Sequence, residues 1–115
     1  MKSGMKYKQR DIVLIPFPYT DFSSIKQRPA LIISNKKMDK MQDFICCLVT
    51  SNPTKEGILI RKDSFEEEKL PFKSWIKPYR IFTIYNKIIR KKLCTITNDF
   101  YEEVLKEILV YLRRD

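Results

Sequence analysis

One arginine, Arg28, stands where a polar segment of the chain meets an apolar one. The polar segment covers residues 19–27, and the apolar one runs from Pro29 to Ile33. A guanidinium stays protonated at physiological pH and presents its N–H donors in a planar fork that matches the oxygens of an anion. The sequence therefore predicts that Arg28 holds a permanent cation at the edge of a cleft, where a polar loop joins a buried strand.

Other residue types that commonly carry chemistry are absent or unsuitably spaced. The chain has no histidine, and its three cysteines, Cys46, Cys47 and Cys94, fit no zinc-binding or redox spacing. Its only acidic cluster, Asp63 with Glu66–Glu68, is typical of a solvated loop and lacks the ligand spacing of a two-metal site. Histidine acid–base catalysis is excluded, and we expect neither a metal nor another cofactor. The cysteines are interpreted as small buried hydrophobes in a reducing compartment.

Length and charge narrow the class of protein further. A chain of 115 residues predicts one domain, residues 1–115, with a core large enough to need no disulfide. Its 23 lysines and arginines against 14 acids give a net charge of +9, which favours a polyanion, either nucleic acid or acidic protein. Residues 1–10 are basic but lack the apolar stretch of a signal peptide, and no apolar run reaches the ~18 residues of a membrane span. We expect a cytoplasmic protein without membrane association.

Short runs of β-branched and aromatic residues predict a series of strands. Ile12–Ile15 is the first, which Pro16 and Pro18 are expected to stop, and Pro29 is expected to open the next. Phe44–Thr50 is almost continuously apolar, as in a strand that is buried on both faces. Shorter strands are expected at Gly57–Arg61, Ser74–Pro78 and Arg80–Tyr85, with loops or turns at 35–43, 62–69 and 86–92.

The last predicted element is an amphipathic helix of about four turns that packs on the sheet. Asn98 is a candidate N-cap, and Asp99 and Arg113 complement the two ends of the helix dipole. Several short strands followed by one helix predict a mainly β fold, a small and strongly bent sheet or barrel with a C-terminal α-helix. The apolar residues that recur at helical spacing are Phe100, Val104, Leu105, Ile108, Leu109 and Leu112.

Three segments of the chain, taken in order, are similar to one known family. They are Asp11–Ser34 (DIVLIPFPYTDFSSIKQRPALIIS), Phe44–Ser51 (FICCLVTS) and Arg80–Ile84 (RIFTI). Together they resemble the PemK/MazF family of bacterial toxin ribonucleases, over roughly residues 8–112. The resemblance implies an SH3-like barrel, of the kind found in PemK and CcdB, that forms a homodimer. It also implies single-stranded RNA, including mRNA, as the substrate, and a cognate antitoxin, expected to be acidic, that silences the toxin over an overlapping surface.

The same resemblance assigns roles to individual residues. Arg28 matches the catalytic arginine of the family, and Thr50 matches its catalytic threonine or serine at a strand end, with Ser51 as a close substitute. Asp21 is the only acid in the loop before Arg28, so it is the candidate proton acceptor. It lies further from the arginine than the loop carboxylate that some family members carry. Arginine and hydroxyl groups are poor bases, and the identity of the base therefore stays open.

The residue types at this site restrict the reaction. Without histidine or clustered acids, the nucleophile is expected to be the 2′-OH of the RNA itself. Its attack forms a dianionic phosphorane, which a guanidinium can stabilise with two hydrogen bonds. DNA lacks this nucleophile. We therefore expect a metal-independent, sequence-selective endoribonuclease that cleaves single-stranded RNA.

Aromatic and basic residues near these positions are candidates for holding the RNA. Tyr19 and Phe22 in the first loop are expected to stack on unpaired bases. Phe17 and Trp75, in contrast, are expected to be at least half buried. The remaining candidates for RNA contact are Lys26, Ser51, Lys77 and Arg80.

Two other functions stay open at this stage. The same barrel could bind RNA without cleaving it, with Arg28 serving only to position the strand. It could also be a gyrase-poisoning toxin like CcdB. The Arg28-Pro29 motif and Thr50 favour cleavage, and incubation with RNA in the presence of EDTA separates the three functions.

Overall fold

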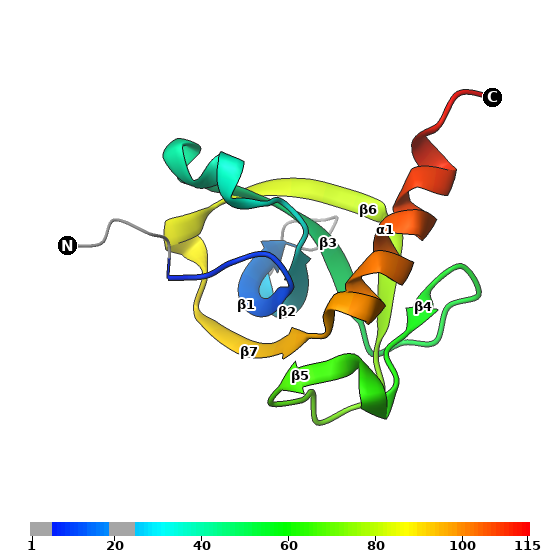
Figure 1. The fold of residues 1–115 in the computed structure, drawn as a ribbon. Coiled ribbons are helices and arrows are strands. Elements are labelled where there is room, and N and C mark those ends of the chain that lie inside the picture. Colours follow the sequence, from blue (N-terminus) through cyan, green and yellow to red (C-terminus); the bar gives the residue numbers. More distant parts are fainter. Residues whose placement is uncertain (1–5, 19–24) are drawn as a thin grey trace.

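The chain folds into a curled antiparallel sheet with one long helix at its C-terminal end (Figure 1). The structure is a computed structural model, and it describes residues 6–18 and 25–115. Within these residues the strands follow the order β4-β6-β3-β2-β1-β7-β5 in one sheet, and every neighbouring pair is antiparallel. The predicted fold class, a mainly β fold with a C-terminal helix, is confirmed. The strands are β1 (Asp11–Pro18), β2 (Ile25–Ile32), β3 (Asp43–Thr50), β4 (Ile58–Leu59), β5 (Phe65–Glu67), β6 (Trp75–Tyr85) and β7 (Lys91–Ile96).

The central strands β1, β2 and β3 are buried on both faces, and they separate two hydrophobic cores. One core, which we call the helix-side core, receives Ile12, Leu31 and Cys47 together with residues of the C-terminal helix. The other, which we call the second core, receives the neighbouring residues of the same strands, such as Val13, Ala30 and Cys46. Because successive side chains of a strand point to opposite faces, each of these strands contributes to both cores. The expectation that Phe44–Thr50 is buried on both faces is confirmed.

The C-terminal helix α1 (Asn98–Leu112) covers the helix-side core with one face. Its N-cap is Thr97, whose side chain accepts a hydrogen bond from the Phe100 N–H at 3.1 Å, so the prediction of Asn98 as the cap was wrong by one residue. Thr97 has the extended backbone that an N-cap needs, whereas Asn98 is already helical. The Tyr101 hydroxyl donates to the Ile33 carbonyl at 2.8 Å and joins the helix to the end of β2. No helix among the described residues is long and apolar enough to cross a membrane.

Two prolines, Pro16 and Pro29, lie inside strands, and Pro18 is the last residue of β1, which corrects the predicted strand boundaries. Pro16 and Pro18 belong to β1, and Pro29 is the fifth residue of β2. Pairing of β1 with β7 ends at Leu14, so both β1 prolines lie where the strand has β2 as its only neighbour. Pairing of β2 with β3 begins at Ala30, one residue after Pro29. Each proline therefore lies where its strand has lost one neighbour, so a missing N–H breaks no ladder on that side.

Several segments predicted as loops have regular structure. The expected loop 35–43 contains the 3₁₀ helix η1 (Lys36–Met41), and the acidic loop contains η2 (Lys62–Ser64) and β5. The expected turn 86–92 contains η3 (Asn86–Ile88) and runs directly into β7, a strand that the sequence analysis missed. The two strand pieces expected around Pro78 form the single strand β6, whose pairing with β3 shifts register between Cys47 and Val49.

The buried carboxylate of Asp11 joins the first strand to the strand that closes the sheet. Its side chain is 1% exposed, and it accepts hydrogen bonds from the Lys8 backbone N–H at 3.0 Å and from the Thr95 hydroxyl of β7 at 2.8 Å. The Lys8 ammonium lies 3.3 Å from the same carboxylate. Arg10 precedes it with a positive φ of 81° and donates to the Ile96 carbonyl of β7 at 2.6 Å. Two adjacent residues thus hold β1 and β7 together where a register shift interrupts their ladder.

We expect Asp11→Asn to lower the free energy of unfolding by about 2 kcal/mol, because one carboxylate oxygen is replaced by an amide donor that faces other donors. Urea denaturation monitored by the fluorescence of Trp75 measures the change. Asp115→Asn makes the same substitution at the exposed C-terminus and is expected to change stability by less than about 0.5 kcal/mol. Equal stability of the two variants would contradict the structural role assigned to Asp11.

Candidate active site

Arg28 is the fourth residue of β2 and lies on the face of the strand that contributes to the second core. It is paired with Ile15 of β1, and it follows Ala30 and Ile32 of the second core by alternation. Arg28 is partly exposed, so it lies at the boundary between the buried sheet and solvent. Lys26, two residues away on the same face, is exposed and is paired with Phe17. The backbone of β2 thus places two cations on the same face as the residues that it contributes to the second core.

Thr50 is the last residue of β3 and is almost completely buried. Its side chain is 7% exposed, and its hydroxyl oxygen accepts a hydrogen bond from the Asn52 N–H at 3.1 Å. This contact fixes the side chain at the point where the chain turns out of the strand, and it leaves the hydroxyl hydrogen to donate elsewhere. Ser51, the neighbouring hydroxyl residue, is exposed.

The strand register brings Arg28 and Thr50 to the same level of the sheet. The printed pairs of β2 with β3 are Ile32 with Cys46, Leu31 with Cys47 and Ala30 with Leu48. Two further steps in this register place Arg28 across from Thr50, just beyond the end of the ladder. Both residues also share a face by alternation, since Arg28 follows Ala30 and Thr50 follows Cys46 and Leu48. Two residues that are 22 positions apart in the sequence therefore converge on one surface.

Strand β6 adds an aromatic residue and a cation to this surface. Trp75 is paired directly with Thr50, and Lys77 follows on the same face by alternation. The Trp75 side chain is partly buried, as expected from the sequence, and its backbone is approached closely by Gly57. A Cβ at position 57 would lie 3.1 Å from the Trp75 Cβ and would collide with Thr54, so glycine lets this segment pack beside Trp75.

After the register shift in β6, Tyr79 and Arg80 lie on opposite faces of the sheet. Beyond the shift, Phe82 is paired with Cys46, so Arg80 returns to the face of Lys77 by alternation. Phe82 contacts Phe17 with ring centroids 5.5 Å apart, and Phe17 is partly buried, as expected. Tyr79 instead lies against Tyr111 of α1, with centroids 5.7 Å apart, and so belongs to the other side of the sheet. We call the shared surface of Lys26, Arg28, Thr50, Trp75, Lys77 and Arg80 the Arg28 face.

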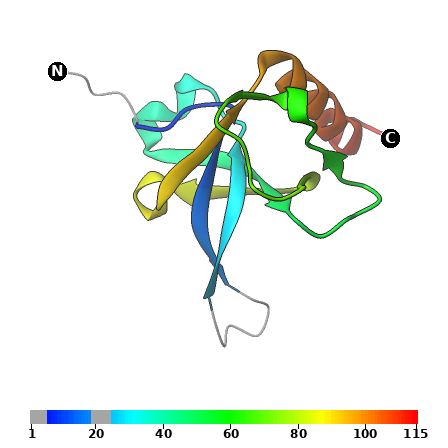
Figure 2. The ribbon, with the colours of Figure 1, turned by 90° about the horizontal axis from the view of Figure 1, so that it is seen from below.

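Three predicted site residues, Tyr19, Asp21 and Phe22, lie outside the described residues. The strands that flank them, β1 and β2, form a hairpin that projects from the body of the sheet (Figure 2). The sequence analysis did not foresee that Trp75 would lie beside Thr50. The available signal was that Thr50 ends one strand and Trp75 begins another, but the register between them cannot be read from composition.

The cysteines next to the site are not available for chemistry. Cys46 and Cys47 are fully buried, and burial raises the pKa of each thiol to about 12. Burial also raises the pKa of Cys94 to about 12, so all three thiols are protonated at neutral pH and pack as small hydrophobes, as predicted. In the part of the chain that the structure describes, no group of three or more Cys, Asp or Glu side chains could hold a metal ion.

The sequence of the chain matches one protein family over most of its length. Residues 8–112 match the family described as PemK-like, MazF-like toxins of type II toxin–antitoxin systems. The chain belongs to this family. The resemblance inferred from the three sequence segments is thereby confirmed, and the toxin class follows from it. No curated protein sequence shows a significant match to the chain.

Solved structures share the fold of this toxin at low sequence identity. A mycobacterial endoribonuclease in complex with its cognate antitoxin matches with a TM-score of 0.75 and 13% identity, over 92% of this chain and 94% of that one. The MazE–MazF complex of Deinococcus radiodurans matches with a TM-score of 0.75 and 16% identity, over 92% and 95%. The toxin MazF-mt6 of Mycobacterium tuberculosis matches with a TM-score of 0.66 and 15% identity, over 89% and 94%. These likenesses establish the fold of the whole toxin.

Proposed function

We propose that this toxin is an endoribonuclease that cleaves single-stranded RNA, including mRNA, in a sequence-selective manner and without a metal ion. The observation that carries the proposal is the convergence of Arg28 and Thr50 on one face of the sheet. The family assignment supports it, as does the description of the mycobacterial neighbours as endoribonucleases. The three buried free cysteines suit a reducing compartment, so we place the toxin in the cytoplasm.

The proposed reaction uses the 2′-OH of the RNA as its nucleophile. The 2′-oxygen attacks the adjacent phosphorus, the bond to the 5′-oxygen of the next nucleotide breaks, and a 2′,3′-cyclic phosphate and a 5′-hydroxyl result. Arg28 donates two hydrogen bonds to the non-bridging oxygens, which carry two negative charges in the phosphorane. Thr50 donates its hydroxyl hydrogen to the same phosphate. Asp21 is our candidate for accepting the 2′-OH proton, and the leaving oxygen takes a proton from water.

The rest of the Arg28 face is proposed to hold the RNA strand. Lys26, Lys77 and Arg80 would contact phosphates, and Ser51 lies exposed directly after Thr50. Trp75 offers an aromatic surface beside Thr50, and Tyr19 and Phe22 are proposed to stack on neighbouring bases. A strand held by aromatic planes and separate cations is recognised when single-stranded, because only unpaired bases expose their faces.

We also propose that the toxin is a homodimer and that an acidic antitoxin inhibits it. The mycobacterial and Deinococcus neighbours, which are described as complexes with antitoxins, support an antitoxin partner. The net charge of +9 favours an acidic one. For the dimer, the support is a set of exposed apolar residues on α1 and β6, where Tyr79 and Tyr111 are in contact. Its other members are Ile81, Leu109, Val110 and Leu112, of which Leu109 and Leu112 were expected to pack on the sheet but are half or more exposed.

Arg28→Ala is expected to lower the rate of RNA cleavage by about 10²–10³, because a preorganised donor to the transition state is lost. Single-turnover cleavage of a long RNA measures the effect, and mapping the cut sites defines the cleavage motif. Arg114→Ala removes an arginine at the exposed C-terminus and serves as the control, with activity within about twofold of wild type. A folded Arg28→Ala protein that keeps more than about a tenth of the activity would exclude Arg28 as the catalytic cation.

Thr50→Val tests the hydroxyl in the same assay. Valine preserves the shape of the side chain, so the fold is expected to lose only about 1 kcal/mol with the Asn52 hydrogen bond. Thr50→Ser keeps both hydrogen-bonding roles and is expected to restore most of the activity.

An RNA with a single 2′-deoxynucleotide on the 5′ side of the scissile phosphate should resist cleavage completely, because the nucleophile is missing. The unmodified RNA should be cleaved equally well in EDTA and in Mg²⁺. Mass spectrometry of the products should find the 2′,3′-cyclic phosphate. Cleavage of the deoxy-substituted RNA, or dependence on Mg²⁺, would show that another nucleophile acts; tight binding without cleavage would favour an RNA-binding function.

The combined substitutions Leu109→Glu and Leu112→Glu should convert a dimer to a monomer, because they place four charges in the interface of two chains. Light scattering at micromolar concentration measures the mass. Met41→Glu changes an equally exposed apolar residue in η1 and is expected to leave the dimer intact. A wild-type monomer under these conditions would remove the homodimer from the proposal.

A further inference from the structure

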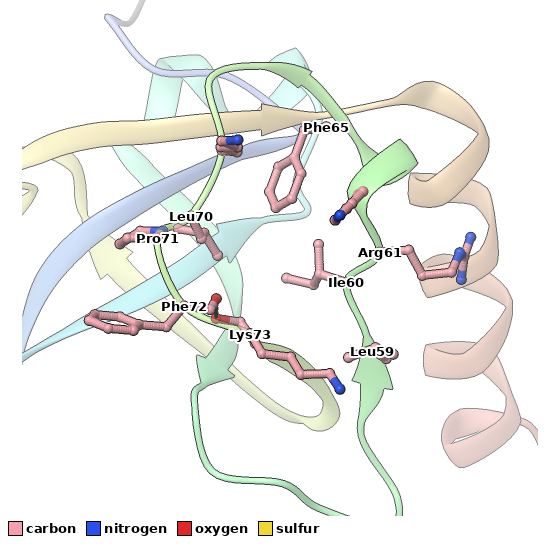
Figure 3. Close-up of a pocket in the computed structure, with 11 residues that line it drawn as sticks. Leu59, Ile60, Arg61, Phe65, Leu70, Pro71, Phe72 and Lys73 are labelled. Atoms are coloured by element: carbon pink, nitrogen blue, oxygen red, sulfur yellow. Dashed lines mark hydrogen bonds between the residues drawn. The ribbon is translucent and has the colours of Figure 1, made fainter.

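A cavity of about 700 Å³ lies beside the helix-side core (Figure 3). Its walls are the segment Leu59–Arg61, which leaves β4, and the segment Leu70–Phe72, which leads into β6. Figure 3 shows Leu70 and Ile60 pointing into the space between the two walls, with Phe65 above Ile60. Ile60, Phe65 and Leu70 also pack against the helix-side core, so the cavity is a side pocket of that core.

The cavity offers an apolar lining and few hydrogen-bonding groups. The Ile60 N–H already donates to the Ser74 carbonyl at 2.9 Å, and the Ser74 hydroxyl donates to the Phe72 carbonyl at 2.9 Å. The Arg61 N–H donates to the Ser64 hydroxyl at 3.1 Å. Reading a nucleobase requires free donors and acceptors, whereas burying an aliphatic or aromatic side chain requires none. The lining therefore fits a bulky apolar side chain better than a base.

The rim of the cavity is mainly positive, because three of the four acids nearby, Asp63, Glu66 and Glu67 but not Glu68, form ion pairs with cations other than the rim lysines. Asp63 lies 3.4 Å from Arg61, Glu66 lies 3.0 Å from Arg10, and Glu67 lies 2.9 Å from Lys92. The hydrogen bond from Lys92 also lowers the pKa of Glu67, which keeps that carboxylate ionised and engaged. Within residues 6–18 and 25–115, no ion pair joins the rim lysines to a carboxylate. These rim lysines are Lys62, Lys69 and Lys73.

An exposed aromatic side chain stands at the mouth of the cavity. Phe72 is 73% exposed, and in Figure 3 its ring points away from the cavity while Lys73 extends along the opposite edge. Burial of so exposed a ring by a partner is favourable, because apolar surface is removed from water. Interfaces concentrate their binding energy in such apolar anchors, while surrounding charges set the orientation and speed of encounter.

We propose that this cavity is a docking site for an acidic protein segment that inserts a bulky apolar side chain between its two walls. The proposal rests on the proposed function only in that the antitoxin would supply this segment. Its carboxylates would pair with Lys62, Lys69 and Lys73, and its apolar residue would contact Leu70 and cover Phe72. None of the residues that line the cavity belongs to the Arg28 face, so such a segment would anchor the partner without covering Arg28 or Thr50.

The test uses the full-length, ¹⁵N-labelled toxin and an acetylated, amidated hexapeptide of sequence Glu-Asp-Leu-Phe-Glu-Asp. Chemical shifts of the backbone amides report where the peptide binds, and their saturation gives the dissociation constant. We expect the shifts to cluster within residues 59–74. Replacing the central Leu-Phe by Gly-Gly, which keeps the charges, is expected to weaken binding at least tenfold.

Substitutions in the toxin test the two parts of the docking site separately. Phe72→Ala is expected to weaken binding about five- to tenfold through lost apolar contact, and the combined Lys69→Glu and Lys73→Glu substitutions about tenfold through charge reversal. Lys37→Glu makes the same charge change on η1, distant from the cavity, and is expected to have less than a twofold effect. All of these side chains are exposed, so the fold is expected to persist.

Three results would overturn the proposal. The first is a lack of saturable shifts around the cavity at millimolar peptide, and the second is equal binding of the Gly-Gly peptide. The third is displacement of the peptide from the cavity by hexauridylate, which would make the cavity a nucleic-acid subsite. RNA cleavage distinguishes this proposal from the proposed function: Phe72→Ala should cleave normally, and Arg28→Ala should bind the peptide normally. An inactive wild-type toxin that binds the peptide would refute only the proposed function.

Discussion

The position of the candidate site depends on the fact that β2 and β3 separate two hydrophobic cores. Ala30 and Cys46 face one core, while Leu31 and Cys47 face the other, so neither strand has a polar face that could be turned outward. A slip of one residue in either strand would exchange every side chain between the cores. The slip would also move Arg28 or Thr50 to the opposite face of the sheet. The burial of aliphatic residues therefore fixes which side chains meet, although these residues take no part in chemistry.

The same constraint explains why the site lies at the end of the paired sheet rather than within it. Inside the sheet, both faces are filled by the two cores, and a guanidinium there would lose its hydration without compensation. Beyond Ala30 the strand β2 keeps only β1 as a neighbour, and the hairpin leaves the body of the sheet. Pro29 marks this border, and Arg28 is the first residue beyond it. Thr50 lies at the corresponding border of β3, where its hydroxyl accepts the hydrogen bond of the following turn.

The sequence predicts the elements whose patterns are unambiguous. The run Phe44–Thr50 and the helix were foreseen because burial on both faces and a 3.6-residue period leave clear traces. Strand β7 was missed because it begins with the two lysines Lys91 and Lys92, and because it is held by long-range contacts with β1 through Asp11 and Arg10. The prolines of β1 were misread because their tolerance depends on where a neighbouring strand ends. The assignment of Arg28 and Thr50 to one site came from family resemblance and not from periodicity, since register between distant strands is a property of packing.

The charge of the toxin is divided unevenly between its surfaces, and this division suits two kinds of partner. On the helix side, Arg10, Arg61 and Lys92 form ion pairs with Glu66, Asp63 and Glu67. Lys62, Lys69 and Lys73 remain on the rim of an apolar cavity. On the Arg28 face, the cations lie near the hydroxyl of Thr50 and the aromatic ring of Trp75. Binding to the Arg28 face should therefore depend mainly on phosphate contacts and fall steeply with salt. Binding at the cavity should persist at higher salt, because the burial of apolar surface is not screened by ions. The two proposed sites would thus use one excess of positive charge for two partners, a nucleic acid and a protein.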